Sequence, residues 1–249
     1  MDIDVVETPE VELLELLNVV TRDVGDELKQ NERDIIGVVR AMGGCPNKYR
    51  RERRAALRAV VSEIYSPPRV TAAAKLLPEL KIIPGFALDL TTTDSDGRHW
   101  DFDDKTMRDR ALQRVREERP LLLVGSPMCT AFSTWQRVNN AFRDPVVVAG
   151  EMARARKHLE FCVELYREQI RGGRYFLHEH PAHASSWQTE QIDKLAREDG
   201  ILRVTCDQCQ YGCESEKGAP IMKPTSFLTN APELSKELTT RCLGRHGQC

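Results

Sequence analysis

Long apolar runs are missing from this chain of 249 residues, and no stretch approaches the roughly 18 consecutive apolar residues of a membrane-spanning helix. The first ten residues, MDIDVVETPE, are acidic where a secretory signal would be basic and then apolar. We therefore expect an intracellular protein that has no membrane partner. In a reducing compartment, its eight cysteines are thiols or metal ligands rather than disulfides.

Internal repeats and low-complexity tracts are also absent, and the net charge is only −2. This small value hides an uneven distribution, because residues 1–40 carry eleven acids against four bases, whereas residues 48–58 carry six bases against Glu52. A basic segment can follow a phosphate backbone, although most such runs are a solvated helix face. The charge pattern leaves both interpretations open.

The apolar spacing divides the chain into three parts. Residues 1–58 form a predicted helical N-terminal appendage, 59–230 an α/β domain, and 231–249 a Cys-, Gly- and His-containing tail that is expected to be truncated. Within 59–230, strands are predicted at 59–65, 86–90, 120–124, 175–178 and 202–205, with a further short one possible at 98–102. Helices are predicted between them, at 70–77, 104–118, 145–171 and 185–198. This alternation indicates a doubly wound, mostly parallel sheet.

One cysteine lies in a loop directly after the most apolar predicted strand. The strand PLLLV (120–124) is followed by GSPMCTAFS (125–133), which places Cys129 at a strand's carboxyl end. Ligands bind and chemistry occurs at that edge of an open α/β sheet, so the thiol is a candidate nucleophile. The alternative is a buried cysteine that serves as a small hydrophobic residue.

A second polar cluster, HEHPAH (178–183), follows the next strand of the sheet. Glu179 is expected to face Cys129 across the sheet edge, where a carboxylic acid can protonate a ring nitrogen while the thiolate adds to the ring. His178, His180 and His183 allow a different interpretation, a zinc-dependent enzyme.

A nucleotide-type cofactor is expected near the first two strands. Ser66 lies in the turn after the first strand, where prolines stand in place of glycines. Asp89 ends the second strand at a position suited to ribose hydroxyls, although an acid there can equally cap a turn. Asp101 and Phe102 form an acid and aromatic pair that suits an adenine.

Cysteines near the C-terminus have zinc-like spacing. Cys206 and Cys209 are separated by two residues, and Cys242 and His246 could complete a tetrahedral site. Cys206 also ends an apolar strand, so a buried structural thiol is the alternative.

Together these segments resemble the cytosine-5 DNA methyltransferases, which are S-adenosylmethionine-dependent enzymes with a Rossmann-like fold. GSPMCTAFS resembles their nucleophile motif, usually Gly-Gly-Pro-Pro-Cys-Gln-x-Phe-Ser. FLHEHP (176–181) is similar to Phe-x-x-Glu-Asn-Val, with His180 in place of the asparagine, and QYG (210–212) resembles a later Asp-Tyr-Gly. The chain also resembles methyltransferase-like portions of retroelement polyproteins.

The resemblance implies S-adenosylmethionine as cofactor and nucleic acid as partner, DNA before RNA, with a nuclear location if DNA is the substrate and other segments of a polyprotein as possible partners. It implies that Cys129 and Glu179 are catalytic. The residues implied to bind the cofactor are Ser66, Asp89, Asp101, Phe102 and Pro127. Those implied to bind the substrate are Ser133, His180 and Lys223. A catalytically degenerate domain that only binds nucleic acid is the alternative.

Overall fold

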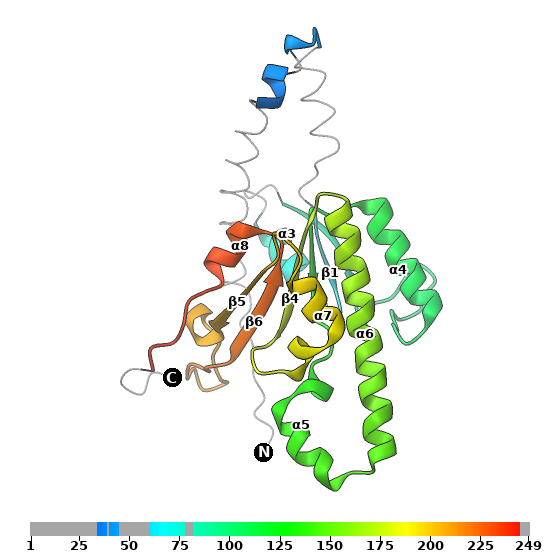
Figure 1. The fold of residues 1–249 in the computed structure, drawn as a ribbon, viewed down its shortest axis with the longest axis vertical. Coiled ribbons are helices and arrows are strands. Elements are labelled where there is room, and N and C mark those ends of the chain that lie inside the picture. Colours follow the sequence, from blue (N-terminus) through cyan, green and yellow to red (C-terminus); the bar gives the residue numbers. More distant parts are fainter. Residues whose placement is uncertain (1–33, 39, 45–59, 78–81, 245–249) are drawn as a thin grey trace.

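The computed structural model describes residues 34–38, 40–44, 60–77 and 82–244, with only the backbone of Arg137. These residues build a six-stranded sheet in the order β2-β1-β3-β4-β6-β5 (Figure 1). The strands are β1 (Val60–Ile64), β2 (Ile83–Leu88), β3 (Leu122–Gly125), β4 (Tyr175–Pro181), β5 (Leu202–Asp207) and β6 (Pro224–Thr229). The first four are parallel to one another, whereas β6 runs antiparallel to both β4 and β5.

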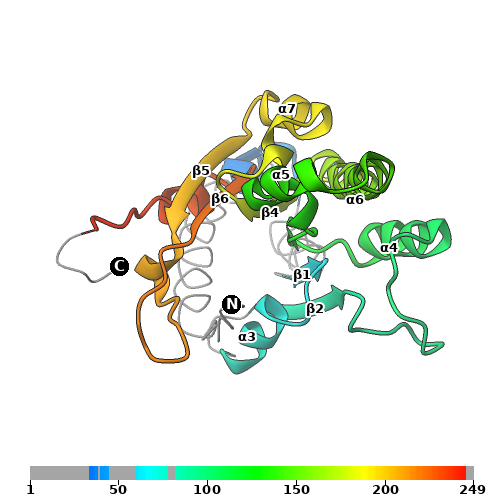
Figure 2. The same ribbon diagram turned by 90° about the horizontal axis from the view of Figure 1, so that it is seen from below.

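Helices cover both faces of the sheet (Figures 1 and 2). On one face lie α3 (Val70–Leu76) and α8 (Pro232–Glu237), and on the other lie α4 (Lys105–Glu118), α6 (Pro145–Arg171) and α7 (Glu190–Ala196). The remaining elements are α5 (Thr134–Asn139) and the short turns η2 (Thr130–Phe132), η3 (Asn140–Phe142), η4 (Ser185–Gln188) and η5 (Gln208–Tyr211). None of the helices in the described ranges has the length and apolarity needed to span a membrane.

Local sequence explains where the main helices begin and end. Asp104 caps α4 by accepting a hydrogen bond from the Thr106 amide at 2.8 Å, and Asp144 caps α6 through the Val146 amide at 2.8 Å. α6 ends at Gly172 and is followed by Gly173 in the left-handed region, with φ of +64°. Each cap satisfies backbone groups that the helix leaves without a partner.

The order of the strands creates a switch point between β1 and β3. The chain passes from β1 outward to β2 and then returns to β3 on the other side of β1. In open α/β sheets, ligands bind outside the carboxyl ends of strands at such a point. That edge lies at the bottom of the sheet in Figure 1, next to α5.

The mostly parallel α/β sheet predicted from the sequence is confirmed, and the strands of the five main predictions are present. The possible strand at 98–102 is wrong, because this stretch is a loop held by a single bridge between Thr93 and His99. The predicted helical appendage, 1–58, lies mostly outside the described residues, of which 34–38 and 40–41 are helical.

The sequence pattern predicts no strand after 205 and no helix after 198, so it misses β6 and α8. β6 lies inside the sheet, between β4 and β5. Leu234 and Leu238 are almost fully buried against the same face of the sheet as α3, with 1% and 3% of their surfaces exposed. Residues up to 238 are therefore part of the α/β domain.

Candidate active site

The turn after β1 is built without glycine. Tyr65 adopts the left-handed conformation, with φ of +59°, which costs an L-residue about 1–2 kcal/mol. The Tyr65 hydroxyl forms a 2.8 Å hydrogen bond with Nδ1 of His158, and its ring packs against Phe102 with centroids 4.7 Å apart. These contacts compensate for the backbone strain and hold the turn in one conformation.

A buried carboxylate occupies the N-terminus of α3. Glu63, which is 1% exposed, accepts hydrogen bonds from the Thr71 amide at 2.8 Å, the Thr71 hydroxyl at 2.7 Å and the Arg69 amide at 3.0 Å. Ser66, predicted to bind a cofactor, donates to Glu63 at 3.1 Å and contacts the Pro67 carbonyl oxygen at 2.8 Å. The negative charge of Glu63 makes this helix end unfavourable for a phosphate group.

The predicted cofactor acids lie beyond β2. Asp89 accepts hydrogen bonds from the amide and hydroxyl of Thr91 at 3.0 and 2.7 Å, and Asp101 accepts one from the Asp103 amide at 2.9 Å. Both acids therefore also cap turns. The Phe102 ring is 3% exposed and packs against Phe161, so it lies in the hydrophobic core rather than on the surface where the adenine was expected.

The loop that carries Cys129 is fixed at both ends. The Ser126 amide donates to the Ile64 carbonyl oxygen at 3.2 Å, which ties the end of β3 to β1. Phe132 is 1% exposed and donates its amide to the Cys129 carbonyl oxygen at 3.0 Å. Ser133, predicted to bind substrate, instead caps α5 by accepting from the Gln136 amide at 3.2 Å. The thiol is thus held on a short turn, only partly buried.

His180 joins β4 to this loop. Its ring is fully buried, with Nε2 2.9 Å from the Pro127 carbonyl oxygen and Nδ1 2.6 Å from the Ser186 hydroxyl. Since a carbonyl oxygen only accepts, Nε2 carries the proton and Nδ1 accepts from Ser186. Both nitrogens are bound within the protein, so His180 positions the loop. The resemblance implied that His180 binds a substrate, but this buried ring does not reach one.

A second buried histidine lies beneath the same loop. His178 is fully buried, its ring centroid is 5.1 Å from that of His180, and its Nδ1 is 3.0 Å from the Tyr166 hydroxyl. Burial lowers the pKa of both rings, to about 4 for His180 and well below the usual value for His178, whose neighbour His180 lowers it further. Both are neutral at pH 7.

Acid is expected to weaken the fold through these two rings. The unfolded chain binds a proton on His180 as the pH falls below about 6.5, whereas the folded chain resists until about pH 4, and the lowered pKa of His178 acts in the same direction. The free energy of unfolding should therefore fall across this window, by on the order of 3 kcal/mol from His180 alone. Urea unfolding at about pH 7.5 and about pH 5 measures the loss, which should be smaller in His180→Gln. Equal losses in the two proteins would contradict this origin.

Cys129, Glu179 and Lys223 lie close together at the carboxyl edge of the sheet. Burial raises the pKa of the Cys129 thiol, and the charge of Glu179 raises it further, whereas the charge of Lys223 lowers it. Glu179 belongs to β4 and is paired with Phe227 of β6, and Lys223 directly precedes β6. Because successive side chains alternate along a strand, Glu179 points to the opposite face from His178 and His180.

The opposing effects of the two charges can be measured by alkylation. Glu179→Gln should lower the pKa of Cys129 and speed its reaction with iodoacetamide at pH 8, whereas Lys223→Met should slow it, because the thiolate is the reactive form. Mass spectrometry of the peptide that contains Cys129 gives the rate, and the partly exposed Cys209 in the same sample serves as control. An unchanged Cys129 rate in both variants would show that neither charge acts on the thiol.

The two metal alternatives find no support in the described residues, which contain no group of three or more His, Cys, Asp or Glu side chains able to hold a metal ion. The histidine site is wrong because His180 uses both ring nitrogens within the protein. Cys206 is 2% exposed near the end of β5, which agrees with the alternative interpretation that it is a buried structural thiol. His246, which was to complete the cysteine site, lies outside the described residues.

The structure brings the charges of Glu179 and Lys223 within range of Cys129, whereas Phe102 is buried in the core and Ser133 caps α5. Sequence reasoning missed Ser186 and Tyr166, which hold the two buried histidines, because neither belongs to a motif with them. It also missed Glu63, because the amides of Arg69 and Thr71 that donate to it lie six and eight residues away along the chain and form no recognised capping motif with it.

Comparison of the chain with models of protein families, with curated proteins and with solved structures gives no match in any of the three.

Proposed function

We propose that this protein is an S-adenosylmethionine-dependent methyltransferase that acts on the 5-carbon of cytosine in nucleic acid, with DNA as the preferred class. The single observation that carries the proposal is the convergence of Cys129, Glu179 and Lys223 at the carboxyl edge of the sheet, one strand from the switch point. A thiol, a carboxyl group and an ammonium group on neighbouring strand ends suit addition to an electron-poor ring.

In the proposed reaction, the Cys129 sulfur forms a bond to the 6-carbon of a cytosine that has left its base stack, while protonated Glu179 donates a hydrogen bond to ring nitrogen 3. Electron density at the 5-carbon rises, and that carbon would take the methyl group from the sulfur of S-adenosylmethionine, which would leave as S-adenosylhomocysteine. Loss of the proton from the 5-carbon to solvent then expels the Cys129 thiolate and restores the aromatic ring. The nucleophile is thus regenerated in each cycle.

The charges around Cys129 couple its activation to binding of the base. Burial raises the pKa of the thiol and ionised Glu179 raises it further, so the free site keeps its nucleophile protonated. When Glu179 holds a proton to engage the ring nitrogen, that repulsion disappears and Lys223 favours the thiolate. Cys129 therefore becomes more reactive when a base is in place.

Two acids that follow β2, the neighbour of β1, suit the proposed cofactor. S-adenosylmethionine supplies an electrophilic methyl group on a positively charged sulfur and carries no phosphate. Asp89 and Asp101 provide carboxylates for its ribose hydroxyls and cationic groups. Glu63 disfavours the pyrophosphate of a dinucleotide at the N-terminus of α3, which argues for a cofactor without phosphate.

Methyl transfer tests the proposal directly. The full chain is incubated with tritiated S-adenosylmethionine and with single- or double-stranded DNA or RNA, and the labelled base is identified after hydrolysis. We expect 5-methylcytosine, formed faster in DNA than in RNA. No label above background in any of the four substrates would refute the proposal, and an absence of heat on titration with the cofactor would favour the degenerate nucleic-acid-binding domain.

A further inference from the structure

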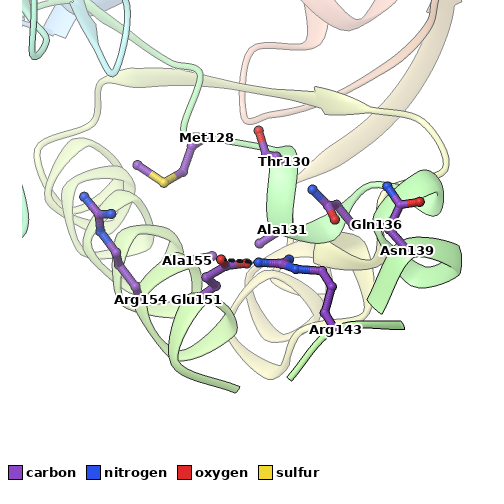
Figure 3. Close-up of a pocket in the computed structure, with 9 residues that line it drawn as sticks. All are labelled: Met128, Thr130, Ala131, Gln136, Asn139, Arg143, Glu151, Arg154 and Ala155. Carbon is purple, nitrogen blue, oxygen red and sulfur yellow. Dashed lines mark hydrogen bonds and ion pairs between the residues drawn. The ribbon is translucent and has the colours of Figure 1, made fainter. Parts of the chain in front are cut away.

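A cavity of about 430 Å³ lies beside the Cys129 loop, between α5 and the N-terminal half of α6 (Figure 3). Met128 and Thr130, the neighbours of Cys129, line it, whereas Cys129 and Glu179 do not. The loop therefore separates this cavity from the thiol. The other lining residues are Ala131, Gln136, Asn139, Arg143, Glu151, Arg154 and Ala155.

Ion pairs hold the charged wall of the cavity in place. Arg143 binds Glu151 through two hydrogen bonds, of 2.9 and 2.5 Å, and so links the end of η3 to α6. Arg154 is paired with Asp103. In Figure 3 the pair of Arg143 and Glu151 closes one end of the cavity, opposite the end formed by Met128 and Thr130.

The wall formed by α5 carries two amide side chains that are available to a ligand. Those of Gln136 and Asn139 form no hydrogen bond with any side chain or backbone group in the described part of the chain. Each amide can donate and accept at once, which is how asparagine and glutamine read the edge of a nucleic-acid base. Apolar contact surface comes from Met128, Ala131 and Ala155.

The segment around the cavity also has the character of a surface for a nucleic-acid strand. Trp135 and Phe142 are 79% and 88% exposed, so both rings are open to contact with a ligand. Residues 134–157 contain five basic residues against two acidic ones. Exposed aromatic rings and excess positive charge are what unpaired bases and their phosphates require.

We propose that this cavity receives the nucleotide adjacent to the target cytosine, and that Gln136 and Asn139 read its base. The inference rests on the proposed function and deepens it by naming the part of the chain that selects sequence context. A nucleic-acid strand that crosses the loop at Met128–Thr130 would place the target base against Cys129 and the adjacent nucleotide in the cavity. Selection of flanking nucleotides by such contacts is a general source of substrate choice in enzymes that act on extruded bases.

The test uses single-stranded oligonucleotides with one cytosine and each of the four bases on its 5′ or 3′ side. Methylation rates of the wild-type protein should differ at least about 5-fold between the best and worst flanking base, and Gln136→Ala/Asn139→Ala should reduce this to less than about 2-fold. Gln191→Ala, which removes a partly buried amide of α7 that donates to Glu160, is the control and should keep the wild-type preference.

Binding of the same oligonucleotides, measured by fluorescence anisotropy, separates this inference from the proposed function. A flanking-base preference in binding that the double variant loses would support the cavity even if no methyl group is transferred. Methylation by the wild-type protein without a flanking-base preference, or the same preference in the double variant, would overturn the inference and leave the proposed function intact. Binding of an apolar peptide to this cavity, with no binding of the oligonucleotides, would overturn the inference as well.

Discussion

Cys129→Ala is expected to slow methyl transfer by at least about 10³-fold, because the 5-carbon of cytosine is activated only when a nucleophile is bonded to the 6-carbon. The thiol is partly exposed on its turn, and its removal should change the free energy of unfolding by no more than about 1 kcal/mol. Rates are measured with tritiated cofactor at saturating oligonucleotide. The loss should therefore appear in the maximal rate and not in binding.

Cys209→Ala is the matched control, since this cysteine is also partly exposed but is not among the groups that act on Cys129. Its rate should equal that of the wild-type protein. A Cys129→Ala protein that retains more than about a tenth of the wild-type rate would rule out covalent catalysis by this residue.

An oligonucleotide with 5-fluorocytosine should trap the covalent intermediate. Fluorine cannot leave the 5-carbon as a cation, so elimination stops and the bond between the Cys129 sulfur and the 6-carbon persists. In the presence of the cofactor, the wild-type protein should form a complex that survives denaturing electrophoresis, and Cys129→Ala should form none. A complex with Cys129→Ala would assign the nucleophile to another residue.

Gly125→Ala is expected to lower the free energy of unfolding by about 2–3 kcal/mol, because it overpacks the core at the end of β3. A methyl group on Gly125 would lie 3.0 Å from Cζ of Tyr166 and closer still to its hydroxyl oxygen. Tyr166 cannot move aside because it is fully buried, its ring stacks on that of Phe176 with ring centroids 4.6 Å apart, and its hydroxyl is hydrogen-bonded to His178. Urea unfolding measures the loss.

Gly150→Ala is the matched control in α6, where no heavy atom lies within 4 Å of the added carbon. It should stabilise the protein by about 0.5–1 kcal/mol through helix propensity. Adding Tyr166→Phe to Gly125→Ala removes the closest contact, so the double variant should lose less stability than the sum of the two single variants. Strict additivity, or a Gly125→Ala protein as stable as the wild type, would show that the close approach costs nothing.

Local patterns in the sequence were sufficient to predict β3 and the loop that follows it. A fully buried strand of four residues requires only an apolar run. Here the strand ends at Gly125, and Ser126 and Pro127 follow it directly. β6 was missed because Pro224–Thr229 is short and begins with proline. It becomes a strand through pairing with β4 on one side and β5 on the other.

The errors in the candidate site have a common physical cause. Phe102 was expected to bind a cofactor because an aromatic ring beside an acid suits an adenine, and His180 was expected to bind substrate because the resemblance places it next to Glu179 in the FLHEHP motif. The packing of Phe102 against Tyr65 and Phe161, and the bonds of His180 to Pro127 and Ser186, involve neighbours in space that no local pattern reveals. Burial then removes the surface that a ligand would need.

The sequence by itself determined that this is an α/β protein with a cysteine loop at one strand end and an acid at the next, because strand periodicity and loop chemistry depend on adjacent residues. Only the tertiary structure decided that Lys223 joins Cys129 and Glu179, and that His180 holds the loop through Pro127, 53 residues away along the chain. It also decided that a cavity opens beside the loop that carries the thiol, lined by Met128 and Thr130. Such contacts depend on how the sheet and helices pack, which no local stretch of sequence specifies.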